Sequence, residues 1–248
     1  MPALLSKIFS EVNLGTLFKI PVKLNWSFFL LIILSLITSG PSDAFTVTLT
    51  LFSVLGHELS HSLVAKKLGI EVKEITLYYF GGIASINLKD NSSSHDELSV
   101  AMAGPIFSIL LGLLLLSVKL TPFVFPAIVP MLGLINLVIG FGNLMPIFPL
   151  DGGRILRSLL KMKWGYIQAT KASLIVARVL GFILLANAII FVHQLIIIAA
   201  IINILTFAES IRFKSETLLP EEKRKINYPS NPESSVIPSP QEVGHENK

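Results

Sequence analysis

The apolar runs of this sequence are too long and too numerous for the core of a soluble domain. Hydrophobic residues make up 52% of the 248 residues, and the mean hydropathy is +0.71. Only 15% of the residues are charged, against about 25% in typical soluble domains. Several runs are long enough to cross the roughly 30 Å hydrocarbon layer of a bilayer as helices. The chain is therefore predicted to be an integral membrane protein.

Gly, Pro and charged residues divide the apolar sequence into six predicted transmembrane helices. Their approximate ranges are 26–38, 44–65, 98–118, 122–145, 172–192 and 194–211. Residues 15–28 alternate enough for a short strand or an interfacial segment, and the alternation within residues 70–88 favours strands. The predicted fold class is an all-α membrane protein of six transmembrane helices with a small membrane-associated β-sheet. Residues 1–213 would form one membrane domain and residues 214–248 a polar, disordered cytoplasmic tail.

The positions of the basic residues predict the orientation of the chain in the membrane. With six helices, the N-terminus, two loops and the tail share one side, and 18 of the 20 Lys and Arg residues fall there. Because basic loops resist translocation, both termini of this multi-pass protein are expected in the cytoplasm. The basic residues flank apolar runs and form no stripe with exposed aromatic residues. The expected surroundings are the lipid bilayer and other membrane proteins, with no nucleic acid.

A histidine pair inside the second predicted helix points to a metal. The chain has no cysteine, so any metal must be held by nitrogen and oxygen ligands. In His57-Glu58-Leu59-Ser60-His61 the two histidines are four residues apart, which places them one turn apart on one helix face. They can therefore bind one zinc ion, and Glu58 can reach the water beside it. Unrelated histidines on a helix are a poor alternative, because ionisable residues within a membrane span are costly.

Two histidines leave a catalytic zinc short of a third protein ligand. The best candidate is Asp151, which follows the fourth predicted helix in Pro149-Leu150-Asp151-Gly152-Gly153. It lies at the same membrane side as the histidines. In the alternative interpretation Asp151 is only a turn or helix-capping residue, but its matching depth favours a ligand.

These motifs occur together with others in an order typical of one family. The chain resembles the site-2 protease family of intramembrane zinc metalloproteases up to about Phe213. The motifs that carry the resemblance are HELSH, Phe80-Gly81-Gly82, Gly104-Pro105 and the NxxPxxPLDGG stretch from Asn143 to Gly153. The chain departs from the family pattern at Ser108, where GPxxN is common, and at Asn25, where HWTF-like sequences are common. It is similar to minimal six-span members without PDZ or CBS domains.

The resemblance implies a role for each motif. His57, His61 and Asp151 would bind one Zn²⁺, Glu58 would act as general base and acid, and Asn143 would hold substrate or the oxyanion. The implied reaction is hydrolysis of peptide bonds in or near transmembrane segments of membrane proteins, as in regulated intramembrane proteolysis.

A substrate helix must unwind to expose a peptide bond, and its freed backbone groups then need partners. Pairing with a strand edge within residues 70–88 would supply them, so Phe80, Gly81 and Gly82 are expected to bind substrate. In the alternative interpretation these residues form a plain hairpin at the membrane surface.

Two other functions fit part of the pattern. A membrane zinc transporter or zinc-binding scaffold could use the same ligands, but it gains nothing from Glu58. A protease of another HExxH family would take its third ligand from a later helix, where only Glu209 and His193 are available and no motif supports them.

Overall fold

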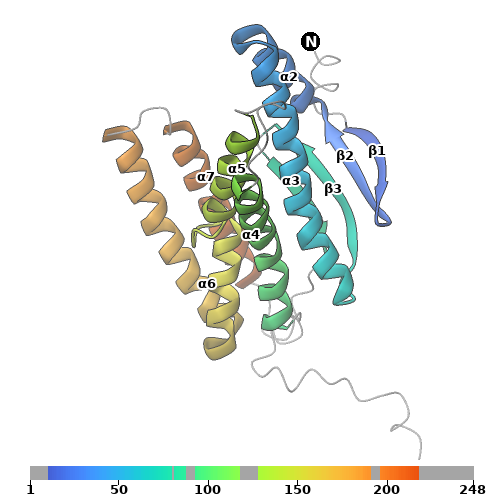
Figure 1. The fold of residues 1–248 in the computed structure, drawn as a ribbon. Coiled ribbons are helices and arrows are strands. Elements are labelled where there is room, and N and C mark those ends of the chain that lie inside the picture. Colours follow the sequence, from blue (N-terminus) through green and yellow to red (C-terminus); the bar gives the residue numbers. More distant parts are fainter. Residues whose placement is uncertain (1–10, 80, 88–92, 118–127, 191–195, 218–248) are drawn as a thin grey trace, which may run out of the picture.

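The computed structural model describes residues 11–79, 81–87, 93–117, 128–190 and 196–217. Within these ranges the chain forms six helices and one four-stranded sheet (Figure 1). In chain order the elements are β1 (Glu11–Leu17), β2 (Ile20–Asn25), α2 (Trp26–Ser39), α3 (Pro41–Lys67), β3 (Val72–Tyr78), β4 (Gly81–Ile86), α4 (Ser94–Ser117), α5 (Ile128–Asn143), α6 (Asp151–Ile190) and α7 (Ile196–Thr217).

The sheet has the order β1-β2-β3-β4, so β4 is an edge strand. β1 with β2 and β3 with β4 form antiparallel pairs, whereas β2 and β3 are parallel because α2 and α3 connect them. On the outer face, the Lys23 ammonium lies 2.8 Å from a Glu74 carboxylate oxygen and 3.2 Å from one of Glu11. Hydrogen bonds to these two carboxylates, Glu74 foremost, raise the pKa of Lys23.

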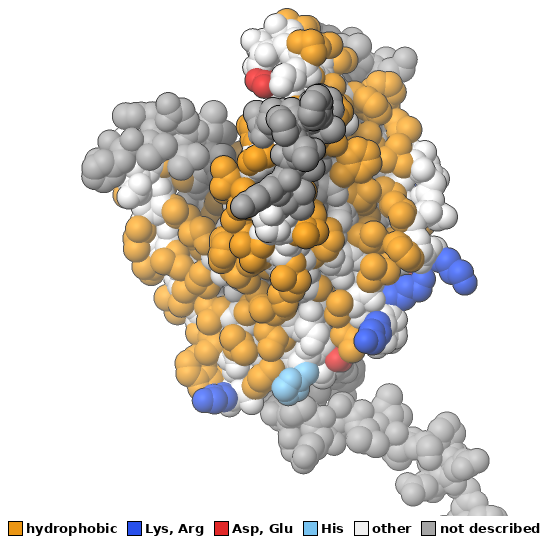
Figure 2. Space-filling view, in the orientation of Figure 1, with side chains coloured by type: hydrophobic (Ala, Val, Ile, Leu, Met, Phe, Trp, Pro, Cys, Tyr) orange, Lys and Arg blue, Asp and Glu red, His pale blue; other side chains and the backbone are white. Residues whose placement is uncertain are grey.

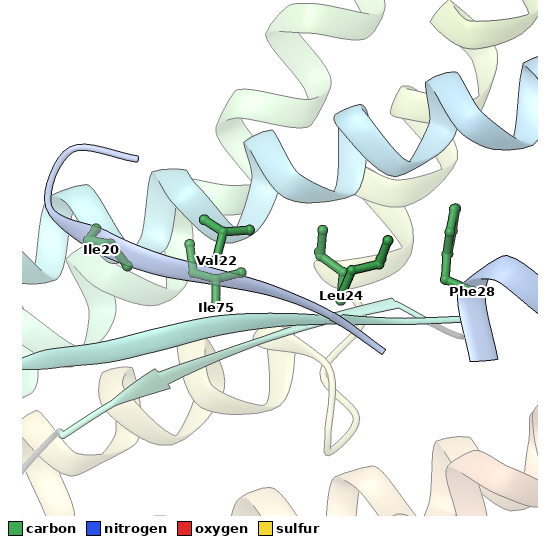
Figure 3. Close-up of a cluster of buried hydrophobic side chains, with 6 residues drawn as sticks. Ile20, Val22, Leu24, Phe28 and Ile75 are labelled. Atoms are coloured by element: carbon green, nitrogen blue, oxygen red, sulfur yellow. The ribbon is translucent and has the colours of Figure 1, made fainter. Parts of the chain in front are cut away.

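One face of the sheet packs on α3, away from α6 and α7 (Figure 1). Alternation in β2 directs Ile20, Val22 and Leu24 to this face, where they meet Phe28 of α2 and Ile75 of β3 (Figure 3). All five side chains are at most 5% exposed. The α3 residues packed against this cluster are Val47, Leu51, Val54, Leu55 and Leu59. The sheet is thereby fixed beside the helix that carries the HELSH motif.

Glycines allow α3, α4 and α5 to approach closely. A Cβ atom added at Gly56 would lie 2.5 Å from the Phe107 ring of α4. Between α4 and α5, a Cβ atom at Gly112, Gly133 or Gly140 would lie 2.6–2.8 Å from a side chain of the other helix. The absence of a side chain at these three glycines therefore lets α4 and α5 pack closely, whereas a Cβ atom at Gly142 would meet no described atom within 4 Å.

The segment 144–150 is held between α6 and α7. Ile147 and Phe148 are buried against both helices, and the Thr206 hydroxyl of α7 donates a hydrogen bond of 2.5 Å to the Phe148 carbonyl. The peptide bond between Phe148 and Pro149 is cis. The helix α6 then bends at Gly165, whose φ of 72° and ψ of 168° are not helical. This packing fixes the start of α6, where Asp151 lies.

Among the described residues, two helices are long and apolar enough to cross a membrane, namely Ser94–Ser117 and Asp151–Ile189. Trp26–Ser39 and Ile128–Asn143 are shorter apolar helices. Large apolar side chains are exposed along the helices, for example Ile37 at 76% and Val138 at 72%. Figure 2 shows hydrophobic side chains over most of the visible face, with Lys and Arg gathered toward its lower end. Such a surface suits contact with lipid.

The predicted class is confirmed at the level of a mostly helical protein with a small sheet. Residues 11–25 contribute two of the four strands of this sheet, where the sequence allowed a short strand or an interfacial segment over residues 15–28. A helix covers part of every predicted span, while the number that cross the membrane stays a prediction. The final helix ends at Thr217, four residues past the predicted domain boundary, and residues 218–248 lie outside the described part of the chain.

Candidate metal centre

Three predicted ligands from two distant segments meet at one point. Nε2 of His57 and Nε2 of His61, both on α3, lie 3.2 Å apart. Oδ2 of Asp151, the first residue of α6, lies 3.2 Å from the first nitrogen and 3.1 Å from the second. All three residues are at most 8% exposed. Among the described residues this is the group of three or more ligating side chains that could hold a metal ion.

The triangle formed by these atoms has the dimensions of a zinc site. Bonds of about 2.0–2.1 Å at tetrahedral angles separate two ligand atoms by about 3.3 Å, close to the three distances of 3.1–3.2 Å. Two imidazole nitrogens and one carboxylate oxygen also match the donor set of catalytic zinc sites, which leave a fourth position open. The residues therefore fit the metal in type and in spacing.

Each histidine has a second partner that orients its ring. Nδ1 of His61 lies 2.6 Å from the carbonyl oxygen of Val100 on α4, so this nitrogen donates and Nε2 is left as the acceptor that binds a metal. Nδ1 of His57 lies 2.9 Å from the hydroxyl of Ser108, also on α4. Such outer partners fix the tautomer and orientation of ligating histidines. Ser108 is one of the two positions that depart from the family pattern.

The helix α4 also leaves room for the metal. A Cβ atom at Gly104 would lie 2.2 Å from Nε2 of His61 and 2.6 Å from Nε2 of His57. Any side chain at this position would occupy the space in front of both ligand nitrogens. The glycine of the Gly104-Pro105 motif is therefore required by the site itself.

The glycines after Asp151 have a related function. A Cβ atom at Gly152 would lie 2.2 Å from the Met145 carbonyl oxygen, and one at Gly153 would lie 2.9 Å from the Phe148 backbone nitrogen. Segment 144–150 can therefore fold back onto the first turn of α6. The second carboxylate oxygen of Asp151, Oδ1, lies 3.7 Å from the Arg154 guanidinium. These contacts hold Oδ2 toward the histidines.

Glu58 points to the sheet. Its Oε2 accepts a hydrogen bond of 3.2 Å from the backbone N–H of Ala84 on β4, and a Cβ atom at Gly82 would lie 2.4 Å from its Cγ. The side chain is half-buried beside the metal ligands. Glu58 thus lies between the metal centre and the edge strand.

The other predicted site residues lie less directly at the centre. Asn143 ends α5, and its side-chain amide donates a hydrogen bond of 2.9 Å to the Ile139 carbonyl. Gly81 and Gly82 are the first residues of β4, an edge strand of the sheet, and their contact with substrate stays a prediction. Phe80 lies outside the described residues, as does His193.

Several residues of the site had no predicted chemical role, namely Val100, Ser108 and Ala84. Ser108 stood out in the sequence only as a departure from the family pattern. The contacts of Val100 and Ala84 use backbone groups, and these leave no signal in residue type.

The fold and the site together define a helical protein with exposed apolar surfaces and a buried His₂Asp metal centre beside a carboxylate. A family model, described as peptidase family M50, matches residues 44–125 and 121–187. The chain belongs to this family. The matched ranges contain both histidines, Glu58 and Asp151.

Individual relatives agree with this assignment. The chain is 33% identical over 199 residues to a zinc metalloprotease of Methanocaldococcus jannaschii, covering 77% of this chain and 58% of the relative. It is 39% identical over 199 residues to a putative zinc metalloprotease of a Synechocystis species, covering 73% of this chain and 52% of the relative. The chain thus spans little more than half the length of these curated relatives. Zinc is the cofactor that these names indicate.

A solved structure is similar as well. The site-2 protease from Methanocaldococcus jannaschii matches with a TM-score of 0.61 and 33% sequence identity, covering 81% of this chain and 95% of that one. The resemblance inferred from the motifs is thereby confirmed at the level of the family.

Proposed function

We propose that this chain is an intramembrane zinc metalloprotease that hydrolyses peptide bonds in or near transmembrane segments of membrane proteins. The observation that carries the proposal is the meeting of His57, His61 and Asp151 within 3.2 Å of one another, with Glu58 adjacent to the first ligand. Membership of peptidase family M50 supports it.

His57, His61 and Asp151 would hold the zinc ion. Bound zinc supplies a Lewis acid that polarises a carbonyl group and makes water nucleophilic near neutral pH. Ser108 and the Val100 carbonyl keep the two imidazole rings in the orientation that binding requires. The burial of all three ligands excludes bulk solvent.

Glu58 performs the proton transfers. One carboxylate oxygen accepts the proton of the attacking water, and the same group then donates it to the nitrogen of the leaving amine. Asn143 contributes through its side-chain amide, which stabilises charge on the carbonyl oxygen of the substrate. In the resting structure this amide donates to the Ile139 carbonyl, so it must turn from its own helix to contact substrate.

The proposed substrates are membrane proteins whose helices unwind near the site. β4 pairs only with β3 among the described residues, so its other edge can receive an extended segment. A cavity of about 580 Å³ adjoins the start of β4. Its walls are mostly apolar and come from α2, α3, α5, the end of β3 and the start of β4, including Leu31, Leu51, Tyr78, Gly81 and Leu134. Apolar side chains of an incoming segment would fit this cavity, which is lined by Gly81, one of the predicted substrate-binding residues.

A transporter or zinc scaffold fits the site less well. Passage of an ion requires ligands that release it into a polar path, whereas here each ligand is braced by a second contact. Neither function uses a carboxylate held beside the ligands. Glu58 is therefore the residue that separates the two functions.

The direct test replaces Glu58 by Gln, which keeps size and hydrogen bonding but removes the base. Purified wild-type and Glu58→Gln protein are incubated with single-span membrane polypeptides, and zinc is measured on the same preparations. We expect bound zinc to be unchanged and cleavage to fall by about 10²–10⁴-fold. Undiminished cleavage by a zinc-loaded Glu58→Gln protein would contradict the mechanism.

The proposed orientation places both termini and the α3–α4 connection in the cytoplasm, as the basic residues predict. Because the chain lacks cysteine, single cysteines report without background. Ser42→Cys and His95→Cys, both at exposed positions, should label from opposite sides of sealed vesicles, with residue 95 cytoplasmic. Labelling from one side would contradict the six-span arrangement.

A further inference from the structure

The strand β4 contacts Glu58 at two points, and neither contact is part of the metal centre. The Ala84 N–H donates to Oε2 of Glu58 at 3.2 Å. The Gly82 backbone lies so close to the Glu58 side chain that an added Cβ atom would be 2.4 Å from Cγ and 3.1 Å from Cδ. Two residues of one strand thus define where this carboxylate can lie.

The direction of the Ala84 N–H follows from the ladder. The backbone N–H and C=O groups of consecutive residues in a strand point to opposite edges, so those of residues three apart do as well. The N–H of Asn87, three residues after Ala84, donates to the Glu71 carbonyl on the β3 side. Ala84 therefore directs its N–H to the open edge, where Glu58 accepts it. The hydrogen bond from Ala84 to Glu58 therefore replaces none of the hydrogen bonds between β3 and β4.

The first two residues of β4 are both glycine, but each position requires glycine for a different reason. Gly81 has φ of +146°, a conformation that favours glycine, and a Cβ atom there would meet no atom of the described residues within 4 Å. Gly82 has no such φ, but its Cβ atom would collide with Glu58. The requirement at Gly82 is therefore for space, and the space is filled by the proposed base.

We infer that β4 positions the general base, with Gly82 giving the side chain room and the Ala84 N–H holding Oε2. This inference rests on the proposed function. One oxygen of Glu58 is then fixed while Oε1 remains for proton transfer. A displacement of about 1 Å in a reacting group can cost about 100-fold in rate, so the strand is a positioning element for catalysis as well as an edge for substrate.

The first experiment needs no substrate. Thermal unfolding in detergent is measured for the wild type, Gly82→Ala, Glu58→Ala and the double variant. We expect Gly82→Ala to lower Tm by about 2–10 °C, as overpacking does. In the Glu58→Ala background, where Cγ is absent, less than half of this decrease should remain. An equal decrease in Tm in both backgrounds would overturn the inference that Gly82 makes room for the Glu58 side chain. Gly142→Ala, a glycine with ordinary φ and open space, controls for the added methyl group.

The second experiment removes the donor. Proline lacks an N–H and is tolerated at an edge strand when that N–H points away from the ladder, so Ala84→Pro removes the contact to Glu58. Its matched control is Ala84→Gly, which retains the N–H. With a fluorogenic single-span polypeptide as probe, we expect Ala84→Pro to lower kcat about 10- to 100-fold with zinc content unchanged. Ala84→Gly should stay within about threefold of the wild type.

The outcomes separate this inference from the proposed function. If the strand served only to bind substrate, Ala84→Pro would raise KM and leave kcat unchanged, which would overturn the inference. In the Glu58→Gln background, Ala84→Pro should lower kcat no further, because the base is already absent. Rapid cleavage by Glu58→Gln would instead contradict the proposed function. Loss of activity in Glu58→Gln with full kcat in Ala84→Pro would remove this inference alone.

Discussion

His57 and Glu58 are consecutive residues of α3, yet two different regions of the molecule hold them. His57 turns toward α4 and α6, where it meets the side chains of Ser108 and Asp151. Glu58 turns toward the sheet, where it meets the backbone of β4. The metal centre is formed by side chains. The position of Glu58 is instead set by a backbone N–H group and by the space that a glycine leaves free.

The difference separates metal binding from positioning of the base. Changes among α3, α4 and α6 alter the ligands or their orientation, so zinc and activity should change together. Changes in β4 reach only Glu58, so zinc should stay while the rate falls.

The largest effect is expected for His57→Ala. Removing one of three protein ligands should reduce bound zinc to a small fraction of one ion per chain, and cleavage should fall with it. Zinc content and cleavage are measured on one preparation. His95→Ala, an exposed histidine on the first turn of α4, is the matched control and should retain both. Full zinc content in His57→Ala would contradict the assignment of His57 as a zinc ligand.

The next effect concerns the ion pair that joins α4 to α6. The Arg157 guanidinium donates to the Glu97 carboxylate, and these side chains are only 15% and 7% exposed. Glu97→Gln removes the carboxylate that pairs with Arg157 and that also lies 3.9 Å from the Lys161 ammonium. The loss of this buried charge should cost about 3–5 kcal/mol of stability. Thermal unfolding in detergent measures the loss.

Glu74→Gln is the control for that variant. Its ion pair with Lys23 is 2.8 Å long, but the two side chains are about 30% exposed, so solvent screens the charges. This control should unfold near the wild-type temperature. Since Glu97 and Val100 share the first turns of α4, Glu97→Gln should also weaken zinc binding. Equal Tm values for the two variants would contradict a structural role for the buried pair.

The sequence predicts the metal ligands better than it predicts the contacts between β4 and Glu58. The spacing of His57 and His61 is a property of one helix, and the motif around Asp151 identifies a ligand by residue type. The Ala84 contact depends on which edge of β4 faces α3, and this follows from sheet register and packing. Residues 15–28 alternate too weakly to distinguish a short strand from an interfacial segment, so the sequence does not predict β1 and β2 as a strand pair. The need for glycine at position 82 can be recognised only when the position of the Glu58 side chain is known.

Asn143→Ala should have an intermediate effect. If the amide stabilises charge on the substrate carbonyl, kcat should fall by about 10²–10³-fold with zinc content unchanged. In the structure the amide donates to its own helix at Ile139, so its loss should change stability little. The measurement is kcat and zinc content on one preparation. Loss of zinc in Asn143→Ala would place this residue among the supports of the metal instead.

The smallest effect is expected for Ser108→Ala. The Ser108 hydroxyl is fully buried and lies 2.9 Å from Nδ1 of His57, whereas the family pattern often has Asn there. Loss of such an outer partner typically weakens metal affinity by about 10- to 100-fold. The dissociation constant, from competition with a zinc chelator, should rise by this factor, and kcat at saturating zinc should change little. Ser158→Ala is the matched control, because Ser158 is equally buried but its hydroxyl has no hydrogen-bond partner among the described residues. An unchanged zinc affinity in Ser108→Ala would mean that His57 is oriented by the packing of α3 and α4 alone, and that a hydroxyl here is only a space-filling replacement for the amide.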